Sequence, residues 1–351
     1  MNRRRSLYLL SASSPALLPG SMGAQGGDPF ERIAKQFMAD YKVPGLSVAF
    51  ASGGKLKRRE AFGFLNVGVG APLRPEHQFR IASVSKSITA AAIFKLIEAG
   101  RIGLTEPVFG SGGILPYEGP DGITVYQLLT HTSGGWPGGE NDPMFQKLDY
   151  GHAKLIQWAL KEYPPVDPPG KSYAYSNFGY CLLGRIIEVK TNQLYDTYVK
   201  GAVLKPCGIN LMHLGANYPG RDESQYYNEK GKVVTYPMEI RRMDAHGGWV
   251  GSPTELVEFG LRVDGFPEPP DILQEDTVKA MTYRGGLNPG YACGWNVNEH
   301  GHYWHMGSLP GLTSILVRTS GGDVWAACAN TRREGMSLAL DELMWKLREI
   351  L

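Results

Sequence analysis

The stretch ASVSKSITAAAIFKLIEAG, residues 82–100, joins a short polar start to a long apolar pattern that stops at Gly100. Apolar residues surround most of the circumference of this segment, which is typical of a helix buried in the centre of a protein. Ser83 and Lys86 stand at its polar end, three residues apart, and so share one face of a helical turn. The stretch therefore predicts a central helix with a hydroxyl and an amine at its N-terminal end.

These two side chains have the chemistry of a nucleophile and its base. A serine hydroxyl is a weak nucleophile and needs a base within hydrogen-bonding distance. A buried lysine loses its proton more readily because desolvation disfavours its charged form, so burial would make Lys86 a better base. The backbone N–H of Ser83, at a helix start, can stabilise an oxyanion. Ser-x-x-Lys is nevertheless frequent by chance, and a serine at a helix start is usually only a cap.

The composition limits the classes of protein to consider. The chain has 351 residues, 42% hydrophobic and 20% charged, which indicates a soluble globular protein with one composite domain or two. A net charge of +2, with no basic run beyond residues 3–5, argues against a nucleic-acid partner. No later segment reaches the roughly 18 apolar residues of a membrane span. Nothing in the sequence indicates the oligomeric state.

Residues 1–27 are expected to be an export signal or a disordered N-terminus. A basic start, a short apolar stretch and a region of small residues are typical of a secretory signal. Arg4-Arg5 also resembles a twin-arginine signal. We therefore expect a periplasmic or extracellular protein, with a cytoplasmic location as the alternative. The four cysteines form no CxxC pair, so we expect buried thiols, or one disulfide if the protein is exported.

Strand patterns occur near both ends of the chain. Hairpins are predicted within residues 46–68, 291–307 and 313–331, the last two turning at Asn298–Gly301 and Ser320–Gly322. Consecutive hairpins favour antiparallel pairing. Helices are expected from Asp28, a predicted N-cap followed by proline, and in the C-terminal segment with leucines at helical spacing: Leu338, Leu340, Leu343 and Leu347.

The fold class that follows is α/β of the α+β type, with an antiparallel sheet of five or more strands flanked by helices. Residues 106–245 are rich in proline and glycine, contain helical segments and show no long strand pattern. We therefore expect a mostly helical insertion over 106–245. Residues 28–105 and 246–351 would together form one discontinuous α/β domain.

Two further motifs carry polar side chains. Tyr175-Ser176-Asn177 lies between a Pro-Gly turn and a helical segment; its phenol is a possible base and its amide a possible donor. His305-Met306-Gly307 ends a strand pattern, where a glycine allows a ligand to approach the backbone closely.

In this order, SVSK, YSN and HMG resemble the motifs of the serine β-lactamase and penicillin-binding-protein superfamily. The Tyr-x-Asn and His-x-Gly forms are similar to the class C-like branch, with its D-alanyl-D-alanine carboxypeptidases, D-aminopeptidases and family VIII carboxylesterases. Segments 123–134, 168–188 and 247–259 are also similar to family segments. The resemblance covers roughly residues 28–350 and implies a β-lactamase/transpeptidase-like fold.

The resemblance assigns catalytic roles to three side chains. Ser83 would attack a substrate carbonyl and become acylated. Lys86 and Tyr175 would share the removal of its proton and the protonation of the leaving group. Which of the two is the base remains open, as it does in the wider superfamily.

The resemblance also implies the substrate-binding residues. Asn177 would position the substrate and Lys86, and His305 would line the pocket near Tyr175. Gly307 belongs to the same motif, and the backbone N–H of Ser308 would be the second oxyanion donor, opposite that of Ser83.

One departure from the family pattern bears on the substrate. His305 stands where class C β-lactamases usually carry a lysine that helps to bind the β-lactam carboxylate. Histidine is a poorer permanent cation, so carboxylesterase or D-amino-acid peptidase activity is favoured. A class C-like β-lactamase, a D-Ala-D-Ala carboxypeptidase and an acyltransferase are the alternatives. A non-catalytic binding protein on the same scaffold is the alternative from another class.

The substrate is expected to be a small molecule or peptide with an ester, amide or lactam carbonyl, and no cofactor or metal is expected. PPGKS at 168–172 lacks the first glycine of a phosphate-binding loop. In HGHYWH, strand alternation puts the third histidine on the opposite face from the first two, His300 and His302. His131 is expected to be structural, whereas Trp136 and Trp249 either line the pocket or pack in the core.

Overall fold

A computed structural model describes residues 27–351; the export signal expected near the N-terminus lies outside the described residues. The helices are α1 Pro29–Asp40, α2 Ser85–Glu98, α3 Val125–Leu129, α4 His152–Glu162, α5 Asn177–Thr191, α6 Tyr195–Val199, α7 Asp244–Gly247, α8 Pro253–Gly260, α9 Glu275–Met281 and α10 Met336–Arg348. The strands are β1 Gly45–Ser52, β2 Lys55–Asn66, β3 Ala71–Pro72, β4 Phe79–Arg80, β5 His213–Leu214, β6 Trp249–Gly251, β7 Asn296–Val297, β8 Tyr303–Leu309, β9 Leu312–Arg318 and β10 Val324–Ala329.

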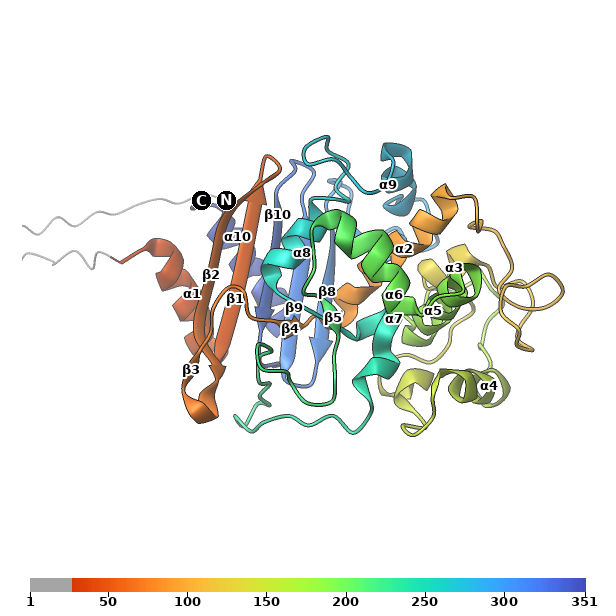
Figure 1. Cartoon of the computed structure of the whole chain (residues 1–351), viewed down its shortest axis with the longest axis horizontal. Helices are drawn as coiled ribbons and strands as arrows, with labels where there is room; N and C mark the ends of the chain where they lie inside the picture. The colour runs from red at the N-terminus through yellow and green to blue at the C-terminus, as the bar shows by residue number, and fades with distance from the viewer. Residues whose placement is uncertain (1–26) are drawn as a thin grey trace, which may run out of the picture.

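The main sheet has seven strands in the order β3-β2-β1-β10-β9-β8-β7, and every neighbouring pair is antiparallel. Its centre joins the two ends of the chain, because β1 pairs with β10 from Leu46 opposite Ala329 to Ala51 opposite Val324. The three hairpins expected from the sequence are β1–β2, β7–β8 and β9–β10. The α/β fold with an antiparallel sheet of five or more strands is therefore confirmed (Figure 1).

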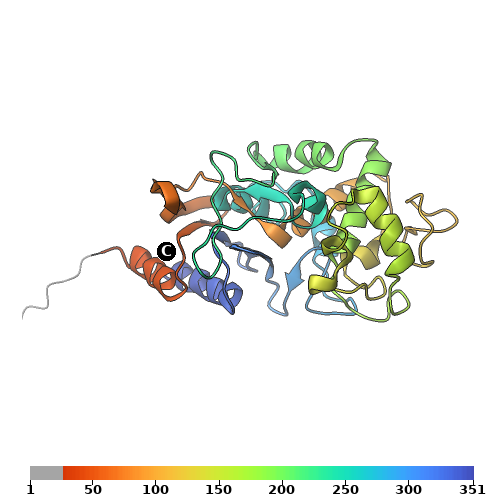
Figure 2. The same cartoon turned by 90° about the horizontal axis from the view of Figure 1, so that it is seen from below.

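Each central strand buries both of its faces in different cores. Leu46, Val48 and Phe50 of β1 contact the core under α1 and α10, whereas Ala49 and Ala51 face the larger core with α2 and α8. This alternation follows from the two-residue period of a strand. Figure 2 shows α1 and α10 side by side on one side of the sheet, with the other helices on the opposite side.

The helices at the two ends of the chain begin and pack for reasons visible in the sequence. The Asp28 side chain accepts a hydrogen bond from Phe30 N at 3.0 Å and caps α1, with Pro29 at the first position. In α10, Leu340, Leu343 and Leu347 are buried. Leu338 is an exception to the expected apolar face, because 66% of it is exposed.

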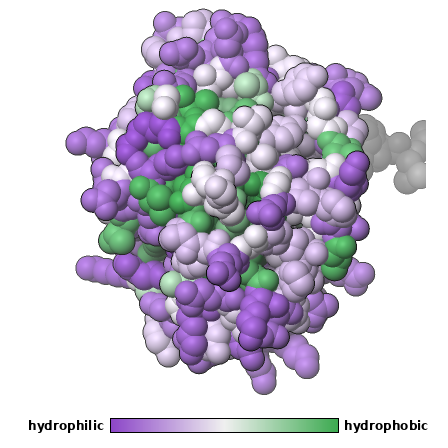
Figure 3. All heavy atoms as spheres, turned by 90° about the vertical axis from the view of Figure 1, so that its right-hand side faces the viewer, coloured by the Kyte–Doolittle hydropathy of each residue, from purple (hydrophilic) through white to green (hydrophobic). Residues whose placement is uncertain are grey.

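Helix α2 lies in the middle of the molecule, as its apolar pattern predicts, and 11 of its residues are buried. Helices α3, α4 and α5 lie beyond it, at the end of the molecule away from β2 and β3 (Figure 1). The surface of that end is mostly hydrophilic, with an apolar area near its centre (Figure 3). The insertion boundaries at 106 and 245 stay a prediction, although one short strand in that range, β5, pairs with β6.

Two further observations concern expectations from the sequence. All four cysteines lie within the described residues, and each is buried and free. No helix among residues 27–351 combines the length and apolar character that crossing a bilayer requires.

Candidate active site

Ser83 lies on a one-turn 3-10 helix, Ala82–Val84, that leads directly into α2. Ala82 adopts a positive φ of 47°, a conformation that costs free energy in residues other than glycine. Ser83 is partly exposed, whereas the residues on either side of it are buried. The backbone therefore turns sharply at this point and leaves the hydroxyl accessible.

The amine of Lys86 lies beneath this hydroxyl, completely buried at 0% exposure. Its Nζ lies 3.2 Å from Ser83 Oγ, 2.7 Å from Asn177 Oδ1 and 2.8 Å from the carbonyl oxygen of His246. Burial lowers the pKa of Lys86 to about 7, although the negative charge of Asp142 acts in the opposite direction. Near neutral pH a substantial fraction of this amine is therefore uncharged.

Tyr175 completes the group around the hydroxyl. It lines the same cavity as Ser83, and the centroid of its ring lies 4.7 Å from Lys86 Nζ. The ring also packs on His131, with centroids 4.3 Å apart. Burial raises the pKa of Tyr175 well above its ordinary value, and the nearby Ser83 hydroxyl only partly offsets this effect. The phenol therefore keeps its proton at neutral pH.

Asn177 is the first residue of α5 and connects Lys86 to a carboxylate that we did not predict. Its side-chain oxygen accepts from Lys86, while its backbone N donates to Asp142 Oδ2 at 2.7 Å. Asp142 is fully buried. Burial raises the pKa of Asp142 to about 6, against the lowering effect of its backbone hydrogen bonds and of Lys86. The dipeptide Asp142-Pro143 is typical of a helical N-cap, but nothing in it indicates a contact 35 residues away.

The third motif lies on β8, where its glycine packs closely against the turn that carries Ser83. A Cβ on Gly307 would overlap the Ile81 carbonyl oxygen and Ser314 Oγ, and would come within 3.1 Å of Ala82 Cβ. The glycine therefore allows β8 to approach the turn that carries Ser83. This close approach sets Ser308, the next residue, at the edge of the site.

His305 lies near Tyr175, with ring centroids 6.3 Å apart, but it is only 3% exposed. Its Nε2 lies 3.1 Å from Tyr291 Oη and its Nδ1 lies 2.8 Å from the backbone oxygen of Met306. Burial, followed by the charge of Lys86, lowers the pKa of His305 to about 3. His305 is therefore a neutral, buried side chain next to Tyr175, and its role as a pocket residue stays a prediction.

A cavity of about 600 Å³ opens above the hydroxyl and is lined by Ser83, Tyr175, Asn177 and Ser308 together with residues that we did not predict. Glu140 and Arg332 are its charged lining residues, and both are exposed. Lys86, His305 and Gly307 are not among the lining residues. The arrangement offers a carbonyl substrate one hydroxyl, a basic amine below it and a protonated phenol beside it.

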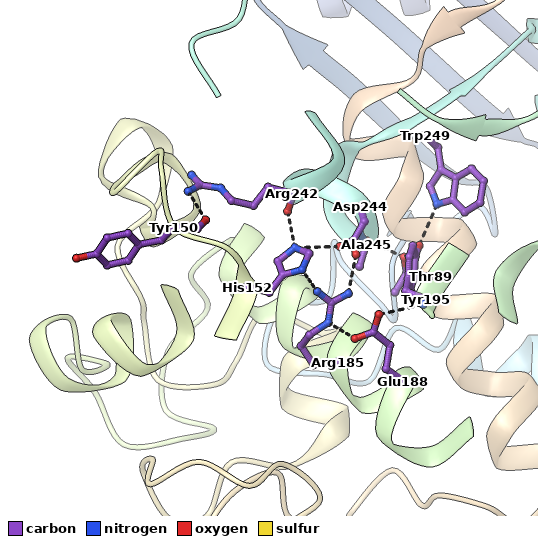
Figure 4. A network of polar contacts seen from close by, with 10 residues as sticks. All are labelled: Thr89, Tyr150, His152, Arg185, Glu188, Tyr195, Arg242, Asp244, Ala245 and Trp249. Carbon is purple, nitrogen blue, oxygen red and sulfur yellow. Dashed lines mark hydrogen bonds and ion pairs between the residues drawn. The ribbon is translucent and has the colours of Figure 1, made fainter. Parts of the chain in front are cut away.

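The carbonyl of His246, which accepts from Lys86, belongs to a segment held by a buried polar network (Figure 4). Arg185 of α5 pairs with Asp244 at 2.6 Å, and Asp244 accepts a second hydrogen bond from Ala245 N. Thr89 of α2 donates to the Ala245 carbonyl at 2.6 Å. His152 contacts Arg185, and its Nε2 lies 2.9 Å from the Arg242 carbonyl. Side chains from three helices, α2, α4 and α5, thus fix the backbone that binds the amine.

Replacing Arg185 with methionine is expected to destabilise the fold by about 3–5 kcal/mol, because it leaves the buried Asp244 carboxylate without its cation. The two side chains are 8% and 7% exposed. Urea unfolding monitored by circular dichroism measures the loss. Lys279→Met removes an exposed ion pair with Glu275 and should change stability very little. Equal losses in the two variants would contradict a structural role for the buried pair.

The other residues considered in the sequence analysis, His131, Trp136 and Trp249, are buried in the fold. His131 is buried, and its Nδ1 accepts from Ser176 N at 3.1 Å, as expected of a structural histidine. Trp136 packs edge-on against Phe178, and Trp249 donates to Tyr195 at 3.0 Å, so both belong to the core. In residues 27–351, histidine, cysteine and acidic side chains do not gather in groups of three that suit a metal ion.

Comparisons with known proteins show which family and fold this chain shares. Protein flp from Staphylococcus aureus (strain NCTC 8325 / PS 47) is 28% identical over 291 residues, which cover 78% of this chain and 57% of that protein. The chain thus spans little more than half the length of that curated relative. The structure of the octameric penicillin-binding protein homologue from Pyrococcus abyssi superposes with a TM-score of 0.73 at 26% identity, covering 86% of this chain and 73% of that one.

The D-amino acid amidase from Ochrobactrum anthropi SV3 has the same fold, with a TM-score of 0.75 at 22% identity over 92% of this chain and 100% of that one. The sequence model of the beta-lactamase family matches residues 30–345. With the Ser83–Lys86 pair, the Tyr175–Asn177 loop and β8 meeting at one cavity, the chain belongs to the beta-lactamase family, within the superfamily of serine β-lactamases and penicillin-binding proteins.

Proposed function

We propose that this chain is a serine hydrolase that cleaves ester or amide bonds through an acyl ester on Ser83. The hydrogen-bond partners of Lys86 support this assignment most directly. Two of them, Asn177 Oδ1 and the His246 carbonyl, can only accept hydrogen bonds. A neutral amine has two N–H groups and one lone pair, so its lone pair faces the remaining partner, the Ser83 hydroxyl. This is the geometry of a base that takes the serine proton.

The protonation states favour Lys86 as the base and Tyr175 as the acid. The Ser83 proton moves to Lys86 Nζ as Oγ bonds to the substrate carbonyl carbon. The bond from this carbon to the leaving oxygen or nitrogen then breaks. The leaving group takes the proton of Tyr175, and Lys86 gives its proton to Tyr175. Water attacks the ester on Ser83, gives one proton to Lys86 and releases the acid; the same proton then returns to Ser83.

Two features of the site bear on the substrate. His305 is neutral and buried, so the third motif supplies no cation for the carboxylate of a β-lactam. An ester or a D-amino-acid amide or peptide is therefore favoured, and the fold is shared with a D-amino acid amidase. A D-Ala-D-Ala carboxypeptidase is the second candidate, because the exposed guanidinium of Arg332 lines the cavity and can bind a substrate carboxylate.

An assay panel tests this function. The purified chain should turn over p-nitrophenyl esters or D-aminoacyl p-nitroanilides faster than nitrocefin, and mass spectrometry should find the acyl group on the peptide that contains Ser83. Faster release of D-alanine from a peptide ending in D-Ala-D-Ala would favour the second candidate. Absence of both turnover and labelling by fluorophosphonate or penicillin probes would indicate a non-catalytic binding protein.

A further inference from the structure

Asp142 is a buried carboxylate that the proton-transfer steps above do not use directly. It caps the one-turn helix Pro143–Phe145, and its Oδ1 accepts from Met144 N at 2.9 Å. Its Oδ2 accepts from Asn177 N at 2.7 Å. Asp142 is 0% exposed, so backbone N–H groups replace water as the hydrogen-bond partners of its two oxygens. A carboxylate is rarely buried this completely without a charged partner.

Asn177 brings this carboxylate and the amine into one unit. The backbone N–H of Asn177 binds Asp142, and its side-chain oxygen binds Lys86. Asn177 is the first residue of α5, where N–H groups have no partner within the helix and the helix dipole favours a negative charge. The Asp142 carboxylate therefore fixes the end of α5 at the point where its side chain meets the amine.

The other titratable groups around Lys86 carry no negative charge at neutral pH. The rings of Tyr175 and Tyr180 lie 4.7 Å and 5.6 Å from its Nζ, and burial raises the pKa of both phenols. Burial also lowers the pKa of the neighbouring imidazoles, which are therefore neutral: His131, His246 and His305. Among the described residues, Asp142 is the anion whose charge acts on Lys86.

We propose that Asp142 is a positioning residue: it holds Asn177 against Lys86 and supplies the negative charge that balances Lys86 once the amine takes the Ser83 proton. This inference rests on the proposed function, because it concerns the same proton transfer. The buried Asp142 side chain would thus both position Lys86, through Asn177, and balance its positive charge.

The test is the pH profile of the Asp142→Asn variant. The amide preserves the shape of the side chain and one acceptor oxygen but removes the charge. Since the carboxylate raises the pKa of Lys86, its removal should move the acidic limb of kcat/KM to lower pH. The plateau should fall by about ten- to a hundred-fold, part of the roughly 10²–10⁴-fold effect of a general base. An acidic limb at the wild-type position would overturn the proposal.

Asp264→Asn is the matched control. Asp264 is also a buried loop carboxylate that accepts from a backbone N–H, that of Phe266 at 2.8 Å, and burial raises its pKa to about 7. It does not line the cavity. This variant should lose stability but keep the wild-type pH profile. A shift of the profile equal to that of Asp142→Asn would mean that the effect reflects general loosening of the fold.

A second measurement covers the case in which Asp142→Asn does not fold. Carboxyl ¹³C NMR of the labelled aspartates follows the titration of Asp142 in the wild type and in Lys86→Met. The positive amine lowers the pKa of Asp142, so its loss should move this titration to higher pH. An unchanged titration would refute the electrostatic link.

The outcomes also separate this inference from the proposed function. If the wild type forms no acyl ester on Ser83, the proposed function fails. If the wild type is active and neither the acidic limb nor the Asp142 titration moves, only the role of Asp142 fails.

Discussion

Replacing Ser83 with alanine should reduce hydrolysis of any accepted ester or amide by at least about 10⁴-fold, because it removes the hydroxyl that lies within reach of the Lys86 amine. The melting temperature should change little, since Ser83 is partly exposed and Lys86 keeps its hydrogen bonds to Asn177 and His246. Steady-state kinetics and intact-protein mass spectrometry after incubation with a fluorophosphonate measure both effects.

Ser87→Ala is a control on the same helix with the opposite expected pattern. The Ser87 hydroxyl is buried and donates to the Gly294 carbonyl at 2.8 Å, away from the cavity. Its loss should lower the melting temperature while labelling continues. If Ser83→Ala still turned over substrate, or still acquired the probe mass at residue 83's peptide, Ser83 would not be the nucleophile.

The second large effect is expected at Lys86. Lys86→Met preserves the length of the side chain but removes the amine, and should lower kcat/KM by at least about 10³-fold, within the range of a lost general base. In the wild type, kcat/KM should rise with pH and level off above the Lys86 pKa of about 7. If kcat/KM of Lys86→Met still rose with pH in the same range, the acidic limb would belong to another group.

Tyr175→Phe separates the roles of the amine and the phenol. The phenol is protonated at neutral pH, so its loss removes a donor to the leaving group and should slow acylation by about 10²-fold. The effect should be larger for amides than for p-nitrophenyl esters, whose leaving group needs little protonation. A loss greater than that of Lys86→Met, for both kinds of substrate, would make Tyr175 the base instead.

The buried amine should also make stability depend on pH. Its folded pKa of about 7 lies below the ordinary value of 10.5, so the unfolded chain binds more protons between these values. The free energy of unfolding of the wild type should therefore rise, relative to Lys86→Met, from pH 7 towards pH 10. Denaturant unfolding of both proteins at several pH values measures this difference.

Much of the architecture was predictable because its causes are local. The apolar, β-rich runs of β1, β9 and β10 and the glycine-containing turns between strands indicate hairpins wherever they occur in a chain. The neighbourhood of Ser83 and Lys86 is local as well, since three residues make almost one helical turn. Short strands such as β4 and β6 were not predicted, because two or three residues are too few to show a period.

The surroundings of the amine depend on contacts between distant parts of the chain. Asn177 lies 91 residues from Lys86, the His246 carbonyl lies 160 residues away, and Asp142 reaches the amine only through Asn177. Tyr175 and Asn177 entered the candidate site through family resemblance, whereas Asp142 and His246 have no local pattern. The sequence by itself determined the sheet, the central helix and the residues able to react. Only tertiary packing decided that the amine is buried against two acceptors, that His305 is neutral next to Tyr175 and that Gly307 brings β8 close to the serine. The reason is that desolvation and distance depend on which parts of the chain the fold brings together.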